Sequence, residues 1–397
     1  MAAMNEQRDH SCDVVIIGGS IIGSAIAYFL LCDGKGGRVT LIEPDPSYEF
    51  AAAPRASGNI RQLWGLPENI QMAKFSREFY IRFPHDMAVD GEPQPTVGWN
   101  QRGYLWLSPP EGRPLLERNY KNQQSFGIDS TILEPPEIAK MFPSITIDGV
   151  GAAAWAPTDG WLDGYLTVQG FRKKARSLGA TYICDRVASV LTQANRTTGV
   201  ALVSGARVKA DIVVDAAGAW GPAIAETIGM KLPVVPVRRM KFYFETPNQV
   251  EPLPMVRDFP RLTMRPEGAG YFAGVSSLSD PPGFNFNVDH DFFEEAVWPA
   301  LAARFTAFET LKVRNAWAGH YEQNLLDTCL ILGTWPGHFE NFFVITGFSG
   351  NGIMHGPAAA RGLSELILHG RFTTIDLSRM GYQRVLDNTP LHENIVI

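Results

Sequence analysis

Residues 13–43, DVVIIGGSIIGSAIAYFLLCDGKGGRVTLIE, decide the fold of this chain. Residues 14–17 are a run of β-forming side chains, which predicts a strand buried on both faces. The glycine turn GGSIIG follows, and an apolar helix is expected over residues 21–32. A second strand over residues 38–42 ends on Glu43. This order of strand, glycine turn, helix, strand and acid is that of a dinucleotide-binding βαβ unit.

Each residue of the turn has a physical role in such a unit. Gly18 permits the sharp bend, and Gly23 lets the helix pack close to the strand. Ser20 replaces the usual middle glycine, and its small side chain is tolerated beside a pyrophosphate, which the helix N-terminus would bind. Glu43 would accept hydrogen bonds from the adenosine ribose, and an acid there disfavours NADP. The predicted contacts of this turn with the cofactor are Gly18, Ser20, Ile21, Ile22 and Gly23. The alternative is a packing turn in an ordinary α/β sheet.

Composition narrows the class of protein. A chain of 397 residues with 45% hydrophobic and 19% charged residues is typical of a globular enzyme with two domains. A net charge of −6 without a long basic run argues against a nucleic-acid partner. The four cysteines show no metal-ligand or disulfide spacing, so no metal site is expected and the thiols suit a reducing compartment. The polar segment 1–12 lacks a signal-peptide core, and no membrane span is predicted, so a cytoplasmic location is expected.

Two later segments repeat the junction between a strand and a glycine turn. The first is DIVVDAAGAW at residues 211–220, and the second is NFFVITGFSGNGIMH at residues 341–355, with a helix expected over 357–368. Proline-rich residues 84–150 interrupt the pattern and suggest an inserted domain. We therefore expect a discontinuous nucleotide-binding domain and a second domain with its own strands.

The three motifs together resemble the D-amino-acid oxidase superfamily of flavoenzymes, most closely its sarcosine oxidase, glycine oxidase and dimethylglycine dehydrogenase branch. The resemblance spans nearly the whole chain. It implies FAD in an α/β fold, with a Rossmann-like discontinuous domain and an α+β substrate domain built on an antiparallel sheet. The expected ranges are 12–83, 151–230 and 320–397 for the FAD-binding domain, and 84–150 and 231–319 for the substrate-binding domain.

The resemblance also assigns cofactor contacts. Covalent relatives attach flavin through a cysteine in the segment before the last strand; residues 317–322 contain none, and Cys329 lies too late, so FAD is expected to be non-covalent. Oxidases carry a lysine after the third glycine turn, whereas this chain has Met354, which leaves either O₂ or an electron carrier as the acceptor. The remaining implied FAD contacts are Ser57, Gly58, Val187, Ala217, Gly218, Trp220, Gly350, Asn351, Gly352, Ile353 and Met354.

The implied reaction is oxidation of the C–N bond of an N-substituted amino acid, such as a sarcosine- or iminodiacetate-like substrate. Hydride passes to flavin N5, and the imine hydrolyses to an amine and an aldehyde or keto acid. Arg61 matches the carboxylate-binding arginine of the family, Tyr271 and Tyr321 match substrate-facing aromatics, and His355 could assist deprotonation of the amine. Each could instead be structural.

A second anion clamp among the arginines of the substrate domain would suit a dicarboxylate. Two other functions stay open: oxidation of a hydroxy acid or alcohol phosphate, and an FAD-binding electron-relay subunit without its own turnover.

Overall fold

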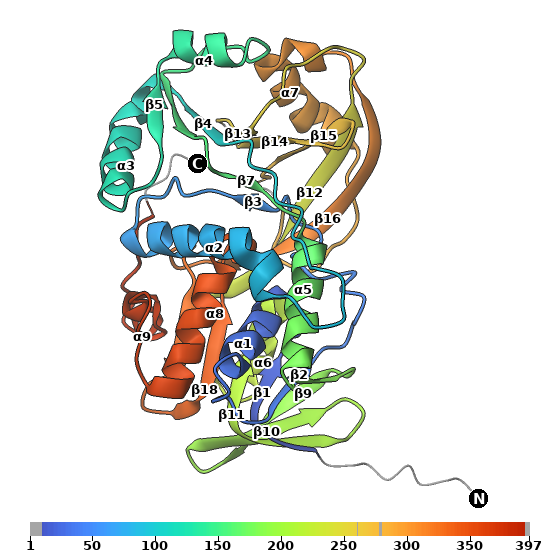
Figure 1. Cartoon of the computed structure of the whole chain (residues 1–397), viewed down its shortest axis with the longest axis vertical. Coiled ribbons are helices and arrows are strands. Elements are labelled where there is room, and N and C mark those ends of the chain that lie inside the picture. Colours follow the sequence, from blue (N-terminus) through green and yellow to red (C-terminus); the bar gives the residue numbers. More distant parts are fainter. Residues whose placement is uncertain (1–9, 260, 278–279, 394–397) are drawn as a thin grey trace, which may run out of the picture.

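The computed structural model describes residues 10–259, 261–277 and 280–393, so the polar residues 1–9 used to predict the location lie outside the described residues. Two eight-stranded sheets dominate it, one in the lower half and one in the upper half of Figure 1. The predicted combination of a Rossmann-like sheet with a largely antiparallel second sheet is confirmed.

The first sheet has a parallel centre, in which β11, β1, β2 and β8 are neighbours and β18 lies parallel to β11. The antiparallel strand β17 closes one edge, and β9 and β10 form a hairpin that continues from β11. Its strands are β1 (His10–Ile17), β2 (Val39–Ile42), β8 (Thr181–Ile183), β9 (Val187–Gln193), β10 (Arg196–Leu202), β11 (Arg207–Asp215), β17 (Ile331–Trp335) and β18 (Phe339–Thr346).

Helices cover one face of this sheet. Helix α1 (Ile21–Leu31) packs against α5 (Gly164–Ser177) and α8 (Gly352–His369), and α2 (Pro67–Asp86) crosses α8. The hairpin β9–β10 and α6 (Gly221–Glu226) contribute a second hydrophobic cluster with the central strands. The central strands are buried on both faces, and burial of apolar side chains away from water is favourable. These strands are therefore continuous hydrophobic runs, as the sequence predicted.

The second sheet runs in the order β16–β12–β15–β14–β13–β4–β6–β5. One face packs on a phenylalanine-rich core with α7 (Trp298–Arg304), and the other face looks toward the first sheet. Its strands are β4 (Tyr104–Ser108), β5 (Thr131–Leu133), β6 (Ala152–Ala156), β12 (Val234–Glu245), β13 (Met255–Arg257), β14 (Leu262–Glu267), β15 (Gly270–Val275) and β16 (Lys312–Asn324). The remaining elements are β3 (Asn59–Ile60), β7 (Gly160–Trp161), α3 (Arg113–Ser125), α4 (Pro135–Met141) and α9 (Gln383–Leu386).

Two boundaries differ from the sequence-based expectation. Strand β6 pairs with β4 and β5 in the second sheet, although residues 151–230 were expected in the nucleotide domain. Helix α8 begins at Gly352 rather than at Pro357, which lies inside it. Proline has no N–H to donate to the carbonyl of Ile353, and the hydroxyl of Tyr80 donates to that carbonyl instead, at 2.7 Å. The carbonyl that proline would leave unpaired therefore has a partner.

None of the helices in the described ranges is long and apolar enough to cross a membrane. Nor do the described residues bring three histidine, cysteine or acidic side chains together in a way that could hold a metal ion. All four cysteines are free thiols.

Candidate active site

The three glycine turns meet at one edge of the first sheet. Strands β1, β11 and β18 are parallel neighbours, so their carboxyl ends lie side by side. The N–H of Ala216 donates to the carbonyl of Ile17 at 2.9 Å, and the hydroxyl of Thr346 donates to the carbonyl of Gly218 at 3.3 Å. A cavity of about 890 Å³ opens at this edge and extends to the second sheet. Ligands of α/β sheets bind at such an edge.

The first turn has the backbone that the sequence predicted. Gly18 has a φ of +96°, and a Cβ atom on Gly23 would lie 1.9 Å from the carbonyl oxygen of Gly18. Ser20 is the N-cap residue of α1, but its side chain makes no capping hydrogen bond, and the first turn of α1 carries no acid. The N–H groups at this helix start are therefore available to an anion such as a pyrophosphate.

Glu43 lies at the end of β2 beside this turn. Its carboxylate accepts hydrogen bonds from the N–H of Gly19 at 2.8 Å and from the N–H of Asp45 at 2.9 Å. These bonds fix the carboxylate at the cavity wall, where lone pairs remain for a hydroxyl donor. Burial raises the pKa of Glu43, and the two backbone donors oppose that change.

The third turn joins the cofactor region to the second sheet. Gly350 has a φ of +92°, and a Cβ atom there would lie 2.3 Å from the ring of Tyr321, a residue of β16. Helix α8 begins at Gly352 and directs its N-terminus toward the cavity. A glycine is required where the tyrosine ring meets the backbone so closely.

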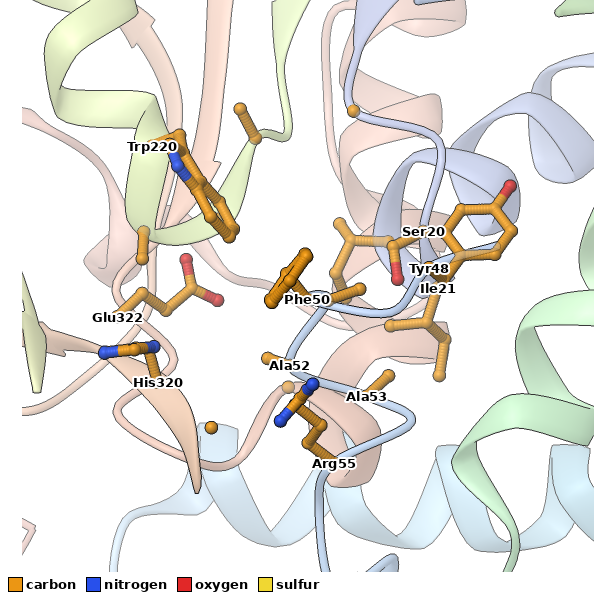
Figure 2. Close-up of a pocket in the computed structure, with 18 of the residues that line it drawn as sticks. Ser20, Ile21, Tyr48, Phe50, Ala52, Ala53, Arg55, Trp220, His320 and Glu322 are labelled. Atoms are coloured by element: carbon orange, nitrogen blue, oxygen red, sulfur yellow. The ribbon is translucent and has the colours of Figure 1, made fainter. Parts of the chain in front are cut away.

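Most predicted cofactor residues line this one cavity. They are Gly18, Ser20, Ile21, Ile22, Glu43, Ser57, Gly58, Val187, Ala217, Gly218, Trp220, Gly350, Gly352, Ile353 and Met354, joined by the predicted substrate residue Tyr321. Two predicted contacts do not line it: Gly23 is buried between helix and strand, and Asn351 is the N-cap of α8. The cavity therefore joins segments that are far apart in the sequence, from the glycine turns of the first sheet to β12 and β16. Figure 2 shows Ser20 and Ile21 of the first turn, Trp220, and His320 and Glu322 of β16 around it.

Arg61 lies just beyond the cavity wall, two residues after Asn59. Its guanidinium stacks between Trp64, at 3.7 Å from the ring centre, and Trp106, at 4.4 Å. It donates to the carbonyl of Leu63 at 3.1 Å and forms no ion pair with any acid in the described part of the chain. Burial lowers the pKa of Arg61 to about 10. A buried guanidinium of this kind gains from an anionic partner.

Of the four predicted catalytic residues, Tyr321 lines the cavity, Arg61 lies outside its lining, and His355 and Tyr271 lie elsewhere. His355 is buried in the first turns of α8 against Trp64, and burial followed by the charge of Arg61 lowers its pKa to about 3, so it is a weak proton acceptor. Tyr271 lies on β15, where its ring packs against Phe244 and Phe308 of the second core. The single-residue alternation along β15 turns Tyr271 away from the cavity.

Two acids near the cavity were not singled out by the sequence. Glu322 lines the cavity and accepts from the hydroxyl of Thr346 at 2.8 Å and the N–H of Gly347 at 3.2 Å. Asp215 ends β11 and accepts from the N–H of Ala217 at 3.1 Å. Burial raises the pKa of each carboxyl to about 7. Nothing in the local sequence signals this, because the two acids are 107 residues apart and only the sheet brings them to the same edge.

Basic side chains of the second sheet were also missed or left unassigned. Lys241 and Arg239 alternate along β12 and both line the cavity. Arg55, in the loop between β2 and β3, reaches toward the cavity and donates hydrogen bonds to the carbonyl oxygens of Glu49 and Ala318. His320 of β16 lies across from it (Figure 2). The alternation of charged residues in VRRMKFYFE at 237–245 is the signal that could have identified the pair on β12.

Comparison with known proteins agrees with this geometry. The profile of the family described as "FAD dependent oxidoreductase" matches residues 13–366. FAD-dependent oxidoreductase domain-containing protein 1 of Xenopus laevis is 35% identical, over 97% of this chain and 85% of the relative. Human sarcosine dehydrogenase, a mitochondrial protein, is 25% identical, over 91% of this chain and 40% of the relative. The crystal structure of L-proline dehydrogenase from P. horikoshii superposes with a TM-score of 0.86 at 25% identity, over 97% of this chain and 100% of that one.

Proposed function

The chain belongs to the family of FAD-dependent oxidoreductases, and from this premise we propose that it oxidises the C–N bond of an N-substituted amino acid of the sarcosine or iminodiacetate kind. Two observations together carry the proposal. One cavity is built from three glycine turns, and the buried cations Arg61, Arg239 and Lys241 lie in or near its wall without an acidic partner among the described residues. Such cations suit the carboxylate that every amino-acid substrate carries.

The described residues fit FAD bound without a covalent link. The free N–H groups at the start of α1 would hold the pyrophosphate, Glu43 the ribose, and Val187 the adenine end of the cavity. Ser57, Gly58 and the turn at residues 350–354 would lie along the flavin. Cys329 is buried outside the cavity lining, and burial raises its pKa to about 12, which disfavours the reactive thiolate. When bound, FAD supplies the acceptor for the hydride that leaves the carbon beside the nitrogen.

The residues of this chain would orient the substrate. Arg61 would bind the substrate carboxylate in a bidentate manner, because its guanidinium plane is already fixed between two indole rings. Tyr321, whose ring packs against Gly350, would form the opposite side of the pocket. This leaves His355 and Tyr271 without a catalytic role in the proposal.

The electron acceptor and the location are separate parts of the proposal. Met354 lines the cavity at the position where oxidase relatives carry a lysine, so we favour an electron carrier over O₂. A cytoplasmic location stays a prediction from composition and free thiols.

The experiment that tests the function is a spectrum followed by a titration. The purified chain should carry a yellow flavin that acid or denaturant releases, which tests the absence of a covalent bond. Under anaerobic conditions, a secondary amino acid such as N-methylglycine should bleach the flavin and yield an amine and an aldehyde or keto acid. Reduction by hydroxy acids or alcohol phosphates alone would replace the proposal by the second candidate, and no reduction by any small molecule would favour an electron-relay subunit.

A further inference from the structure

A row of basic side chains crosses the face of the second sheet that looks toward the cavity. Arg257 on β13 is in register with Thr263 on β14, and Thr263 is in register with Gly274 on β15. Lys241 on β12 reaches across β15, since its ammonium donates to the hydroxyl of Thr263 at 3.2 Å. The four neighbouring strands β12, β15, β14 and β13 thus support one cationic surface, which we call the basic row; its members are Arg239 and Lys241 on β12 and Arg257 on β13.

Gly274 makes the position of the lysine possible. A Cβ atom on Gly274 would lie 3.3 Å from the ammonium nitrogen of Lys241, tighter than an ordinary contact. The missing side chain leaves a channel over β15 along which the lysine extends. Arg239 precedes Lys241 by two residues, so alternation along β12 places both on the same face, and both line the cavity.

The basic row has no acidic partner among the described residues. Arg239 donates to the carbonyl of Arg238 and lies over the Tyr321 ring, and its Nε atom is buried without a hydrogen-bond partner. Arg257 donates to the carbonyl of Arg261 at 3.4 Å and lies over the Trp106 ring, 5.8 Å from the ring centre. The other arginines of the same sheet differ. Arg238, on the opposite face of β12, pairs with Asp280 at 2.9 Å, and Arg265 pairs with Glu267. Arg265 lies on the same face of β14 as Thr263 and is nevertheless paired, so the lack of an acidic partner is specific to Arg239, Lys241 and Arg257 among the described residues of this face.

Burying like charges together is unfavourable unless an anion joins them. Burial, followed by the charges of Arg257, Arg239 and Arg265, lowers the pKa of Lys241 to about 7. Burial also lowers the pKa of Arg239. The basic row places three basic side chains on a sheet face where apolar side chains would suffice. A ligand with a negative charge would offset the free-energy cost of burying them.

One carboxylate does not account for all of these cations. Arg61 is held by Trp64 and Trp106, on a segment that follows β3, whereas the basic row belongs to β12 and β13. Given the proposed function, on which this step rests, the α-carboxylate at Arg61 leaves Arg239 and Lys241 for a second acidic group. We propose that the substrate is a dicarboxylic N-substituted amino acid, whose second carboxylate binds to Arg239 and Lys241 of the basic row.

Binding without chemistry gives the first test. The FAD-loaded chain is titrated with succinate and glutarate, and with acetate and propionate, while the visible spectrum of the flavin reports occupancy. We expect the dicarboxylates to bind at least about ten times more tightly than the monocarboxylates. Lys241→Met should reduce that ratio to near one, and Lys241→Gln is the second variant if the methionine variant folds poorly. Lys312→Met, at the exposed start of β16, is the control and should keep the ratio.

Reduction of the flavin gives the second test. Under anaerobic conditions N-methylaspartate should reduce the flavin at lower concentrations than N-methylglycine in the unmodified chain, and this advantage should disappear in Lys241→Met. Equal affinity for one and two carboxylates, or an unchanged ratio in both lysine variants, overturns the dicarboxylate inference and leaves the proposed function standing. Tight dicarboxylate binding with no flavin reduction by any amine overturns the proposed function and leaves the anion site standing.

Discussion

Replacing Arg61 by methionine separates a substrate-binding role from a structural one. Methionine keeps an apolar side chain of similar reach between Trp64 and Trp106, but it removes the charge and all five N–H donors. If Arg61 binds the substrate carboxylate, affinity must fall while the fold persists. If Arg61 instead holds the two tryptophans and the loop in place, substrate affinity and the free energy of unfolding must fall together.

The structure sets the size of each effect. Burial lowers the pKa of Arg61 to about 10, which at about 1.4 kcal/mol per pKa unit corresponds to a cost of about 3 kcal/mol for its charge. The hydrogen bond to Leu63 and the stacking on two indoles together return about 3 to 4 kcal/mol. The free energy of unfolding should therefore change by less than about 2 kcal/mol. Loss of a bidentate carboxylate contact of about 3 kcal/mol should weaken substrate binding about 100-fold.

The assay measures three quantities on the same preparation: flavin content, the urea midpoint, and the concentration of N-methylglycine or acetate that half-saturates the spectral change. Arg77→Met is the matched control, because Arg77 is half-buried and donates to the carbonyl of Thr158 at 2.8 Å, as Arg61 does to Leu63, but it is not part of the proposed carboxylate site. Unchanged carboxylate affinity with flavin bound would refute the reasoning. So would a loss of stability above about 4 kcal/mol, since it would show that Arg61 supports the fold.

Three further predictions concern the cofactor region. Glu43→Gln should weaken FAD binding about 10- to 100-fold in a fluorescence titration, because an amide offers one acceptor oxygen where the carboxylate accepts from Gly19 and Asp45; an affinity within twofold of the original would contradict this. Folding raises the pKa of Asp215 to about 7, so its ionisation should destabilise the FAD-free chain increasingly as pH rises from about 4 to 7. Asp215→Asn should therefore raise the melting temperature at pH 8 by the equivalent of about 2 to 4 kcal/mol and have no such effect below pH 4. A difference that does not depend on pH would argue against burial of the charge. Gly350→Ala should lower FAD content and stability together, because the new Cβ atom would lie 2.3 Å from the Tyr321 ring; normal FAD content would show that the turn can move.

The glycine turns could be read from the sequence because their cause is local. A positive φ at Gly18 and the contact between Gly23 and the preceding turn depend on residues within a few positions of one another. The strand and helix around them follow from continuous apolar runs on either side of the glycine turn, so α1 begins at the expected residue. The start of α8 was misplaced because the favourable position of proline at a helix start is a preference, and the distant hydroxyl of Tyr80 made an interior proline tolerable.

The positions of single side chains in the pocket depended on tertiary structure. Whether Tyr271 or Phe272 lies on the same sheet face as Lys241 is set by the register of β15 between β12 and β14, and a shift of one residue would exchange them. The basic row needs the four strands β12, β15, β14 and β13 in register and no side chain at Gly274, and none of this can be read from a linear pattern.

Local sequence pattern was enough to predict three glycine turns around a dinucleotide site, because each turn is encoded by its own neighbours. Which charged side chains face the cavity, and which of them lack a partner among the described residues, depended on how the two sheets pack. The physical reason is that burial and pairing are properties of residues brought together across the sheets, over separations of tens to hundreds of positions.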